Sequence, residues 1–202
     1  MKSFFFTIFL LISFSANAMN LFEKNLNNSE EFFKDWEYIS DNVMGGVSEG
    51  KAEILDQDNN YFLRLTGNVS TKNNGGFIQV RSNKDILKDN FTGIKLKVKG
   101  KPSEYYVHIR TNFLLLPWQY YSGEFSVDDE WKYVNVYFKD FKKSNFYQPS
   151  NFSSSEIKSI GFVAFGKDFN AELDIMEAEL FSACLKRKII SQKQKLKIQS
   201  QK

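Results

Sequence analysis

Apolar and polar residues alternate along several short runs of this sequence. In the clearest run, Ile94, Leu96 and Val98 are each followed by a lysine. Successive side chains of a β-strand point to opposite faces, so this run predicts a strand with one face buried and the other in water. Similar runs, separated by Gly, Asn, Asp and Ser, lie at residues 61–65, 77–81, 105–110, 120–127, 134–138, 160–165 and 171–181. About eight or nine short strands without intervening helices predict an all-β, antiparallel β-sandwich.

Length and composition fit a single globular domain. The chain has 202 residues, of which 21 are Phe. Large flat side chains suit the space between two packed sheets. The single cysteine, Cys184, excludes an intramolecular disulfide and every multi-cysteine metal site.

The first 18 residues have the pattern of a secretory signal peptide. Lys2 supplies the positive charge, an apolar run covers residues 4–14, and Ala16 and Ala18 provide the small-x-small cleavage pattern. The apolar run, about eleven residues, is shorter than the roughly 20 that a membrane-spanning helix needs. Cleavage after Ala18 would release a periplasmic or extracellular protein. Retention of the segment as an anchor remains the alternative.

Charge is divided unevenly along the chain. Seven of the 27 basic residues lie in residues 182–202, which contain no acid, and one lies in the leader. The remaining 19 basic residues face 24 acidic ones, a net charge of −5. The tail is either a solvated extension or a contact with an anionic membrane surface, where each cation contributes about 1 kcal/mol. Nucleic acid is not an expected partner, because the protein is predicted to be exported and the tail lacks aromatic stacking residues.

These boundaries divide the chain into four parts. They are a signal peptide at 1–18, an N-terminal extension at 19–35, a β-sandwich domain at 36–181 and a basic tail at 182–202. A short helical turn is expected at residues 30–34 of the extension.

Two glycine pairs interrupt the strand-like runs, one in residues 41–48 and the other in residues 73–77. Adjacent glycines allow positive φ and let another backbone or a ligand approach closely. Such pairs also mark simple turns or bulges. We take the residues of both stretches, with nearby aromatic and basic residues, as the candidate binding surface: Trp36, Asp41, Met44, Gly45, Gly46, Ser48, Asn74, Gly75, Gly76, Arg81 and Trp118.

An apolar run, Phe-Leu-Leu-Leu-Pro-Trp at residues 113–118, lies where a loop is expected between two strands. Pro117 argues against a central strand there. An exposed loop of this composition would mark a partner or ligand site, and a buried one would be a lid on the sandwich. Both interpretations remain open. Arg81 and Arg110 are candidates to pair with Asp41 or Glu104, or with an anionic group of a partner.

Catalytic chemistry is not indicated by the sequence. The only histidine, His108, has no nucleophile and carboxylate placed beside it by any motif, and one histidine cannot build a multi-His metal site. Asp41, Asn42 and Asp174 are possible oxygen donors for a structural calcium ion, although no loop has a dense alternation of such donors. We therefore expect a protein that is not an enzyme and needs no cofactor.

Several motifs occur together in a specific order. D-N-V-M-G-G-V-S at 41–48 is followed by G-N-V-S-T-K-N-N-G-G-F-I-Q-V-R at 67–81, F-T-G-I-K-L-K-V-K-G at 91–100, Y-Y-V-H-I-R at 105–110, W-K-Y-V-N-V-Y-F-K-D-F at 131–141 and I-K-S-I-G-F at 157–162. This ordered set resembles the complex I intermediate-associated protein 30 family. The resemblance implies a galactose-binding-like jelly roll. For the mitochondrial members it also implies a non-enzymatic, chaperone-like role in assembling respiratory NADH:ubiquinone oxidoreductase (complex I).

Two turns depart from the family pattern. Residues 101–104 read Lys-Pro-Ser-Glu where the family has an acidic, glycine-containing turn, and residues 166–169 read Gly-Lys-Asp-Phe where it has Gly-Pro-Phe. Both departures affect loops more than the fold.

Two functions are compatible with these features. The first is an exported assembly or interaction factor with a protein partner, which the resemblance suggests is a respiratory complex subunit. The second is an exported carbohydrate-binding module, which an aromatic loop on a β-sandwich would equally permit. Fold alone does not separate them.

Overall fold

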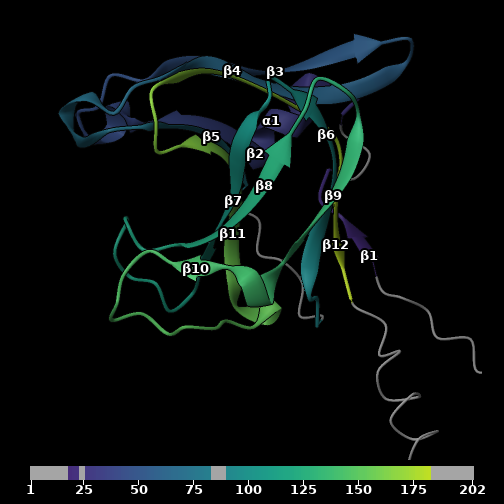
Figure 1. Ribbon diagram of the computed structural model, residues 1–202. Helices are drawn as coiled ribbons and strands as arrows, with labels where there is room; N and C mark the ends of the chain where they lie inside the picture. The colour runs from purple at the N-terminus through teal and green to yellow at the C-terminus, as the bar shows by residue number, and fades with distance from the viewer. Residues whose placement is uncertain (1–17, 23–25, 83–89, 183–202) are drawn as a thin grey trace, which may run out of the picture.

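Two antiparallel sheets pack face to face (Figure 1). The computed structural model describes residues 18–22, 26–82 and 90–182. Sheet A consists of β1 (Ala18–Asn20), β3 (Glu49–Gln57), β4 (Asn60–Val69), β6 (Gly93–Gly100), β9 (Lys132–Tyr137) and β12 (Phe169–Phe181). Its strand order is β3-β4-β12-β6-β9, and β1 also pairs with β12.

Sheet B consists of β2 (Trp36–Ser40), β5 (Phe77–Ser82), β7 (Ser103–Thr111), β8 (Tyr121–Val127), β10 (Lys142–Lys143) and β11 (Ile157–Phe165). Its order is β10-β8-β7-β11-β5-β2. The helices of the described residues are α1 (Ser29–Asp35) and four short 3-10 helices: η1 (Asp41–Met44), η2 (Lys72–Asn74), η3 (Phe138–Asp140) and η4 (Ser154–Glu156). The predicted all-β, antiparallel sandwich is confirmed.

The core lies between the inward faces of the two sheets. Along β6, Ile94, Leu96 and Val98 are completely buried, and the lysines between them lie partly exposed on the other face. Burial of a side chain of this size stabilises the fold by roughly 1.5–3 kcal/mol. In sheet B, Ile109 and Phe162 are buried in the same core. Along each strand, the residues that alternate with these buried ones therefore point away from the core, onto the outer face of sheet B.

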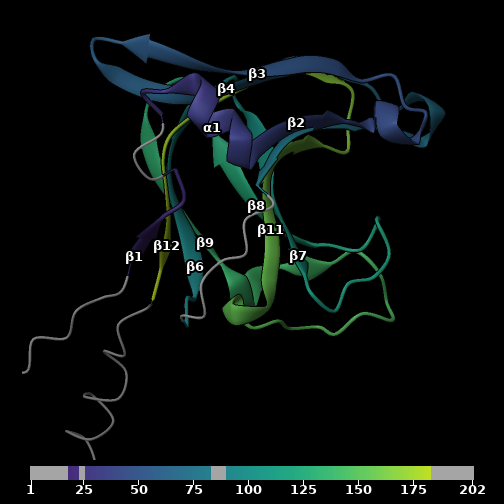
Figure 2. The ribbon, with the colours of Figure 1, turned by 180° about the vertical axis from the view of Figure 1, so that it is seen from behind.

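The described residues between positions 19 and 35 are part of the sandwich rather than an extension from it. Phe22 and Phe32 are buried in the core, and β1 extends sheet A. Phe32 stacks on Trp36, with 5.6 Å between ring centroids, and Trp36 stacks on Phe162 of β11 at 5.5 Å. The predicted helical turn is present as α1, which runs directly into β2 (Figure 2). The domain therefore begins before the predicted boundary at residue 36. The sequence did not indicate this, because Phe22 and Phe32 are isolated aromatic residues without a periodic pattern.

The sequence prediction omitted β3. All nine of its residues are exposed or only half-buried, because the strand lies at the edge of sheet A and pairs only with β4. A strand that buries little surface has little reason to alternate apolar and polar residues.

Within the described residues, no helix has the length and apolar character needed to cross a bilayer. The predicted signal peptide, apart from Ala18, lies outside the described residues, as do Cys184 and the basic tail from residue 183 onward.

Candidate ligand-binding groove

The buried carboxylate of Asp41 joins four strand ends at one end of the sandwich. It accepts hydrogen bonds from the backbone N–H of Ser48 at 2.8 Å, from the Ser48 hydroxyl, and from the backbone N–H groups of Gly76 and Phe77. The Ser48 hydroxyl in turn accepts from the backbone N–H of Ser70 at 2.9 Å. Asp41 follows β2 and Gly76 precedes β5, both in sheet B, whereas Ser48 precedes β3 and Ser70 follows β4 in sheet A. One carboxylate thus ties the two sheets together.

The pKa of the Asp41 carboxyl lies below its ordinary value of 3.8. Burial by itself would raise this pKa, but the hydrogen bonds from Ser48, Gly76 and Phe77 stabilise the charged form more strongly. Asp41 is therefore ionised at neutral pH.

The two glycine pairs fit around this carboxylate. A Cβ at Gly46 would lie 2.3 Å from the Asp41 Cγ, and a Cβ at Gly75 would lie 2.4 Å from its Oδ2. The other member of each pair has positive φ: Gly45 at +88° and Gly76 at +122°. The two glycine stretches, residues 41–48 and 73–77, therefore form one structural unit around this carboxylate, which we call the Asp41 hub.

The apolar loop at residues 113–118 is partly buried and partly exposed. Leu114 is 5% exposed and belongs to the core, whereas Leu115 is 86% and Trp118 is 53% exposed. Each sequence interpretation, lid and exposed patch, thus holds for a different part of the loop.

Hydrogen bonds connect this loop to β7 and to the chain after β10. The Nη2 group of Arg110 donates to the carbonyl oxygens of Leu114 at 3.3 Å and Leu116 at 3.1 Å. Ser144, which follows β10, donates from its hydroxyl to the Trp118 carbonyl at 3.1 Å. The backbone that carries the exposed indole is thus bonded at three carbonyl oxygens, those of Leu114, Leu116 and Trp118.

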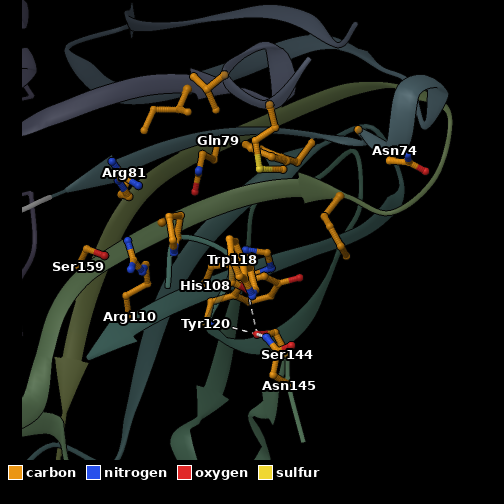
Figure 3. Close-up of a pocket in the computed structure, with 18 residues that line it drawn as sticks. Asn74, Gln79, Arg81, His108, Arg110, Trp118, Tyr120, Ser144, Asn145 and Ser159 are labelled. Carbon is orange, nitrogen blue, oxygen red and sulfur yellow. Dashed lines mark hydrogen bonds between the residues drawn. The ribbon is translucent and has the colours of Figure 1, made fainter. Parts of the chain in front are cut away.

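A groove of about 770 Å³ runs over the outer face of sheet B. Its floor is formed by β5, β7 and β11, and the turns of the Asp41 hub border it near β2 and β5. The apolar loop and Ser144 border it near β8 and β10, on the other side in the strand order. In Figure 3, Arg81, Arg110 and Ser159 lie toward one end and Asn74 lies toward the other. The groove is lined by Ile39, Val43, Met44, Asn74, Gly75, Phe77, Gln79, Arg81, His108, Arg110, Pro117, Trp118, Tyr120, Ser144, Asn145, Ser159, Gly161 and Phe165.

His108 is part of the groove lining without being a titrating group near neutral pH. Its ring stacks on Tyr120, with 4.1 Å between centroids and 19° between planes. Burial lowers the pKa of His108 from 6.5 to about 3. The Nε2 atom is buried and has no hydrogen-bond partner. A neutral, stacked imidazole serves here as a flat packing surface.

The residues predicted as a binding surface fall into three groups. Met44, Asn74, Gly75, Arg81 and Trp118 line the groove. Asp41 and Ser48 are buried in the Asp41 hub, where Gly45, Gly46 and Gly76 shape the turns. Trp36 is buried in the aromatic core and is not part of any exposed surface.

The pairing partners expected for the two arginines were wrong. Arg81 donates to the Glu37 carboxylate at 2.7 Å, across β2 and β5, and Glu104 pairs with Lys167 at 3.3 Å. Arg110 bonds to loop carbonyls instead of a carboxylate. Asp41 is unavailable to either arginine because backbone N–H groups and Ser48 occupy it.

Some of the other groove residues could have been found from the sequence, because the alternation along a strand indicates which residues share the face of Arg81. Gln79 precedes Arg81 by two positions on β5, and Tyr120 lies next to β8, so both share the outer face. Ser144 and Asn145 carry no such signal, because they reach the groove only through the chain path after β10.

The described residues contain no group of three or more His, Cys, Asp or Glu side chains that could hold a metal ion. Of the suggested calcium donors, Asp174 makes a bidentate pair with Arg64, with both distances 2.6 Å, on sheet A. The Asp41 carboxylate is instead occupied in the Asp41 hub by Ser48, Gly76 and Phe77. The two carboxylates are therefore committed to separate structural roles.

Comparison with protein families gives a match to the model described as complex I intermediate-associated protein 30, over residues 25–175. The comparison with curated proteins finds no match.

Among solved structures, the family 11 carbohydrate-binding module of the cellulosomal cellulase Lic26A-Cel5E of Clostridium thermocellum is similar. It has a TM-score of 0.61 and 15% identity, covering 85% of this chain and 96% of the module. A structure of a family 11 module from the same organism, in complex with a β-1,3-1,4-mixed-linked tetrasaccharide, has a TM-score of 0.63 and 16% identity. It covers 85% of this chain and 98% of the module. At these identities the likeness shows a shared fold.

Proposed function

Because the chain belongs to the complex I intermediate-associated protein 30 family, we propose that it is a non-enzymatic interaction protein that holds a segment of a protein partner in the groove over sheet B. Its role would be of the assembly-factor kind, and subunits of respiratory complexes are the partners that the family suggests. The predicted leader supports export to the periplasm or the extracellular space.

The observation that carries this proposal is the exposed apolar border of the groove. Trp118 is 53% exposed, and Val43 and Met44 on η1 are exposed as well. Exposed apolar surface rimmed by polar residues is typical of a protein-contact site. A Trp at the centre of such a contact is a common energetic anchor.

Rigidity adds to the argument. The Asp41 hub fixes the turns at one border, and the hydrogen bonds of Arg110 and Ser144 fix the loop at the other. A preformed groove loses less conformational entropy when it binds a partner.

An enzymatic role has little support in the groove. Its histidine is neutral, with a pKa lowered to about 3, and among the residues that the structure describes it has no oriented carboxylate or nucleophile of the kind that acid–base or covalent catalysis requires. Binding is the simpler function for this lining.

The test is the substitution Trp118→Ala. We expect the variant to fold normally and to lose at least about tenfold in affinity for protein partners captured by crosslinking and identified by mass spectrometry, since truncating a Trp that anchors an interface removes about 2 kcal/mol or more. Tyr133→Ala is the matched control. Tyr133 is also 53% exposed, but it lies on β9 in sheet A. Partners bound equally by both variants would contradict the proposal, and loss of folding in Trp118→Ala would place the loop in the core.

A carbohydrate-binding role is the second candidate. It is favoured by the polar side chains that line the groove together with Trp118 and Tyr120, including Gln79, Ser144 and Asn145, because sugars bind to aromatic faces flanked by hydrogen-bonding side chains. The fold is also similar to that of a module solved with a β-1,3-1,4-mixed-linked tetrasaccharide. Saturable binding of this oligosaccharide or of a glycan-array ligand, abolished by Trp118→Ala, would favour this candidate over a protein partner.

A further inference from the structure

Both charged side chains that line the groove are arginines. Arg81 comes from β5 and Arg110 from β7. They flank β11, in which Gly161 pairs with Arg81 and Ser159 pairs with Arg110. Gly161 has no side chain and Ser159 has a small one, so the strand between the two arginines adds little bulk. Figure 3 shows Arg81, Arg110 and Ser159 gathered in the same end of the groove.

The two guanidinium groups act on each other unfavourably. The pKa of Arg110 is lowered, first by burial and then by the positive charge of Arg81. Within the part of the chain that the structure describes, Arg110 has no carboxylate partner, and its hydrogen bonds go to loop carbonyls. His108, whose pKa is lowered to about 3, is neutral near pH 7 and adds no further positive charge.

Glu37 offsets this repulsion only in part. It accepts from the Nη2 group of Arg81 at 2.7 Å, but its own side chain is 48% exposed, and ion pairs at the surface contribute only about 0–1 kcal/mol. The Nε groups of both arginines are buried without a hydrogen-bond partner. These two atoms are closed to solvent, but the Arg81 side chain as a whole keeps 27% of its surface exposed, so its guanidinium can donate to an anion that enters this end of the groove.

We infer that the groove recognises an acidic residue of the partner segment, whose carboxylate binds between Arg81 and Arg110 while a neighbouring apolar residue contacts Trp118. This inference rests on the proposed function and specifies the chemistry of the bound segment. A planar guanidinium matches a carboxylate in geometry as well as charge. The exposed apolar residues of the border favour a peptide over a sugar acid.

Selection from a random 12-residue peptide library on the immobilised full-length chain tests the inference. We expect the selected peptides to depend on Trp118 and to contain Asp or Glu beside an apolar residue. Replacing that acid by its amide should weaken binding by at least about tenfold, as expected for a hydrogen-bonded charge. The affinity should also fall as salt concentration rises.

Arg81→Gln is the principal variant, because Arg110 also supports the apolar loop. We expect Arg81→Gln to bind the acidic peptide at least about tenfold more weakly and to bind the amide peptide as the wild type does. Lys101→Gln, which removes the same charge from an exposed turn away from the groove, is the control and should change neither affinity. Both variants retain the lysines of the tail, so nonspecific attraction to the tail is the same in each.

The outcomes separate the two levels of the proposal. Peptides that depend on Trp118 but bind equally well as amides would overturn the acidic preference and leave the protein-binding function standing. A library that yields no Trp118-dependent peptide would overturn the protein-binding function itself. Binding of polygalacturonate oligomers that requires Arg81, with no peptide selected, would replace the acidic peptide by an acidic sugar.

Discussion

At the scale of single residues, Asp41 explains why two distant glycine pairs belong together. Its carboxylate takes hydrogen bonds from both sheets, and the missing Cβ atoms of Gly46 and Gly75 leave room for it. Asp41, Gly46 and Ser48, which look like parts of a binding surface in the sequence, therefore have a structural role. They act on the groove indirectly, by fixing the turns that carry Met44 and Asn74.

Asp41→Asn should lower the free energy of unfolding at pH 7 by about 1–3 kcal/mol, because an amide cannot accept from all the buried donors. The pKa of Asp41 is depressed in the folded state. Its contribution to stability is therefore present above the unfolded value near 3.8 and lost as the pH falls through the folded value. Urea unfolding at pH 7, 5 and 3 should show a difference between wild type and variant that shrinks only at the lowest pH.

Asp129→Asn provides the comparison, because Asp129 is an exposed acid in a turn. Its stability should match the wild type throughout this pH range. An Asp41→Asn deficit that is the same at pH 3 and pH 7 would contradict the role assigned to the carboxylate.

At the scale of elements, the apolar loop at residues 113–118 combines an anchor with a display surface. Leu114 packs into the core, and its neighbours Phe113 and Leu115 point into solvent. Arg110 fastens the loop to β7 through two carbonyl oxygens. Neighbouring residues of the loop thus have different roles, one anchoring it in the core and the next presenting an apolar side chain to solvent.

Leu114→Ala should destabilise the protein by about 2–5 kcal/mol, since it leaves a cavity in the core. Leu115→Ala, next to it and 86% exposed, should leave the unfolding midpoint unchanged within the roughly 0.5 kcal/mol typical of surface positions. Thermal and urea melts of the two variants provide the measurement. Equal stabilities would show that the loop does not depend on its buried leucine.

At the scale of the whole molecule, the N-terminal segment completes the sandwich. The aromatic stack of Phe32, Trp36 and Phe162 connects α1 through β2 to the middle of sheet B. β1 meanwhile pairs with β12 of sheet A. The groove is formed on a framework that needs residues before position 36.

Phe32→Ala should therefore lower the free energy of unfolding by about 3–5 kcal/mol, which is typical of a buried Phe. Lys34→Ala, on the exposed side of the same helix, serves as the control for helix propensity and should change stability by less than about 1 kcal/mol. A Phe32→Ala variant as stable as the Lys34→Ala variant would mean that α1 is dispensable.

The sequence by itself determined the class of fold and the apolar loop, for clear physical reasons. Alternation at residues such as Ile94, Leu96 and Val98 follows from a sheet with one wet face, so it predicts strands wherever burial is one-sided. It fails for β3, which buries little, and for Phe22 and Phe32, which are buried without any period. The ordered family motifs needed no structure to be recognised.

Only the tertiary structure decided which candidate residues meet. Nothing in the sequence distinguishes Trp36 and Asp41 from Arg81 and Trp118 as candidate surface residues. The fold buries Trp36 and Asp41, and it brings Arg81 and Trp118 to one groove. The strand order of sheet B places both residues at the same groove. Arg81 is on β5, the Trp118 loop leads into β8, and β11 and β7 between these two strands form the floor. Strand order arises from contacts between residues far apart in the chain, and local alternation specifies the face of a residue without specifying its neighbours across the sheet.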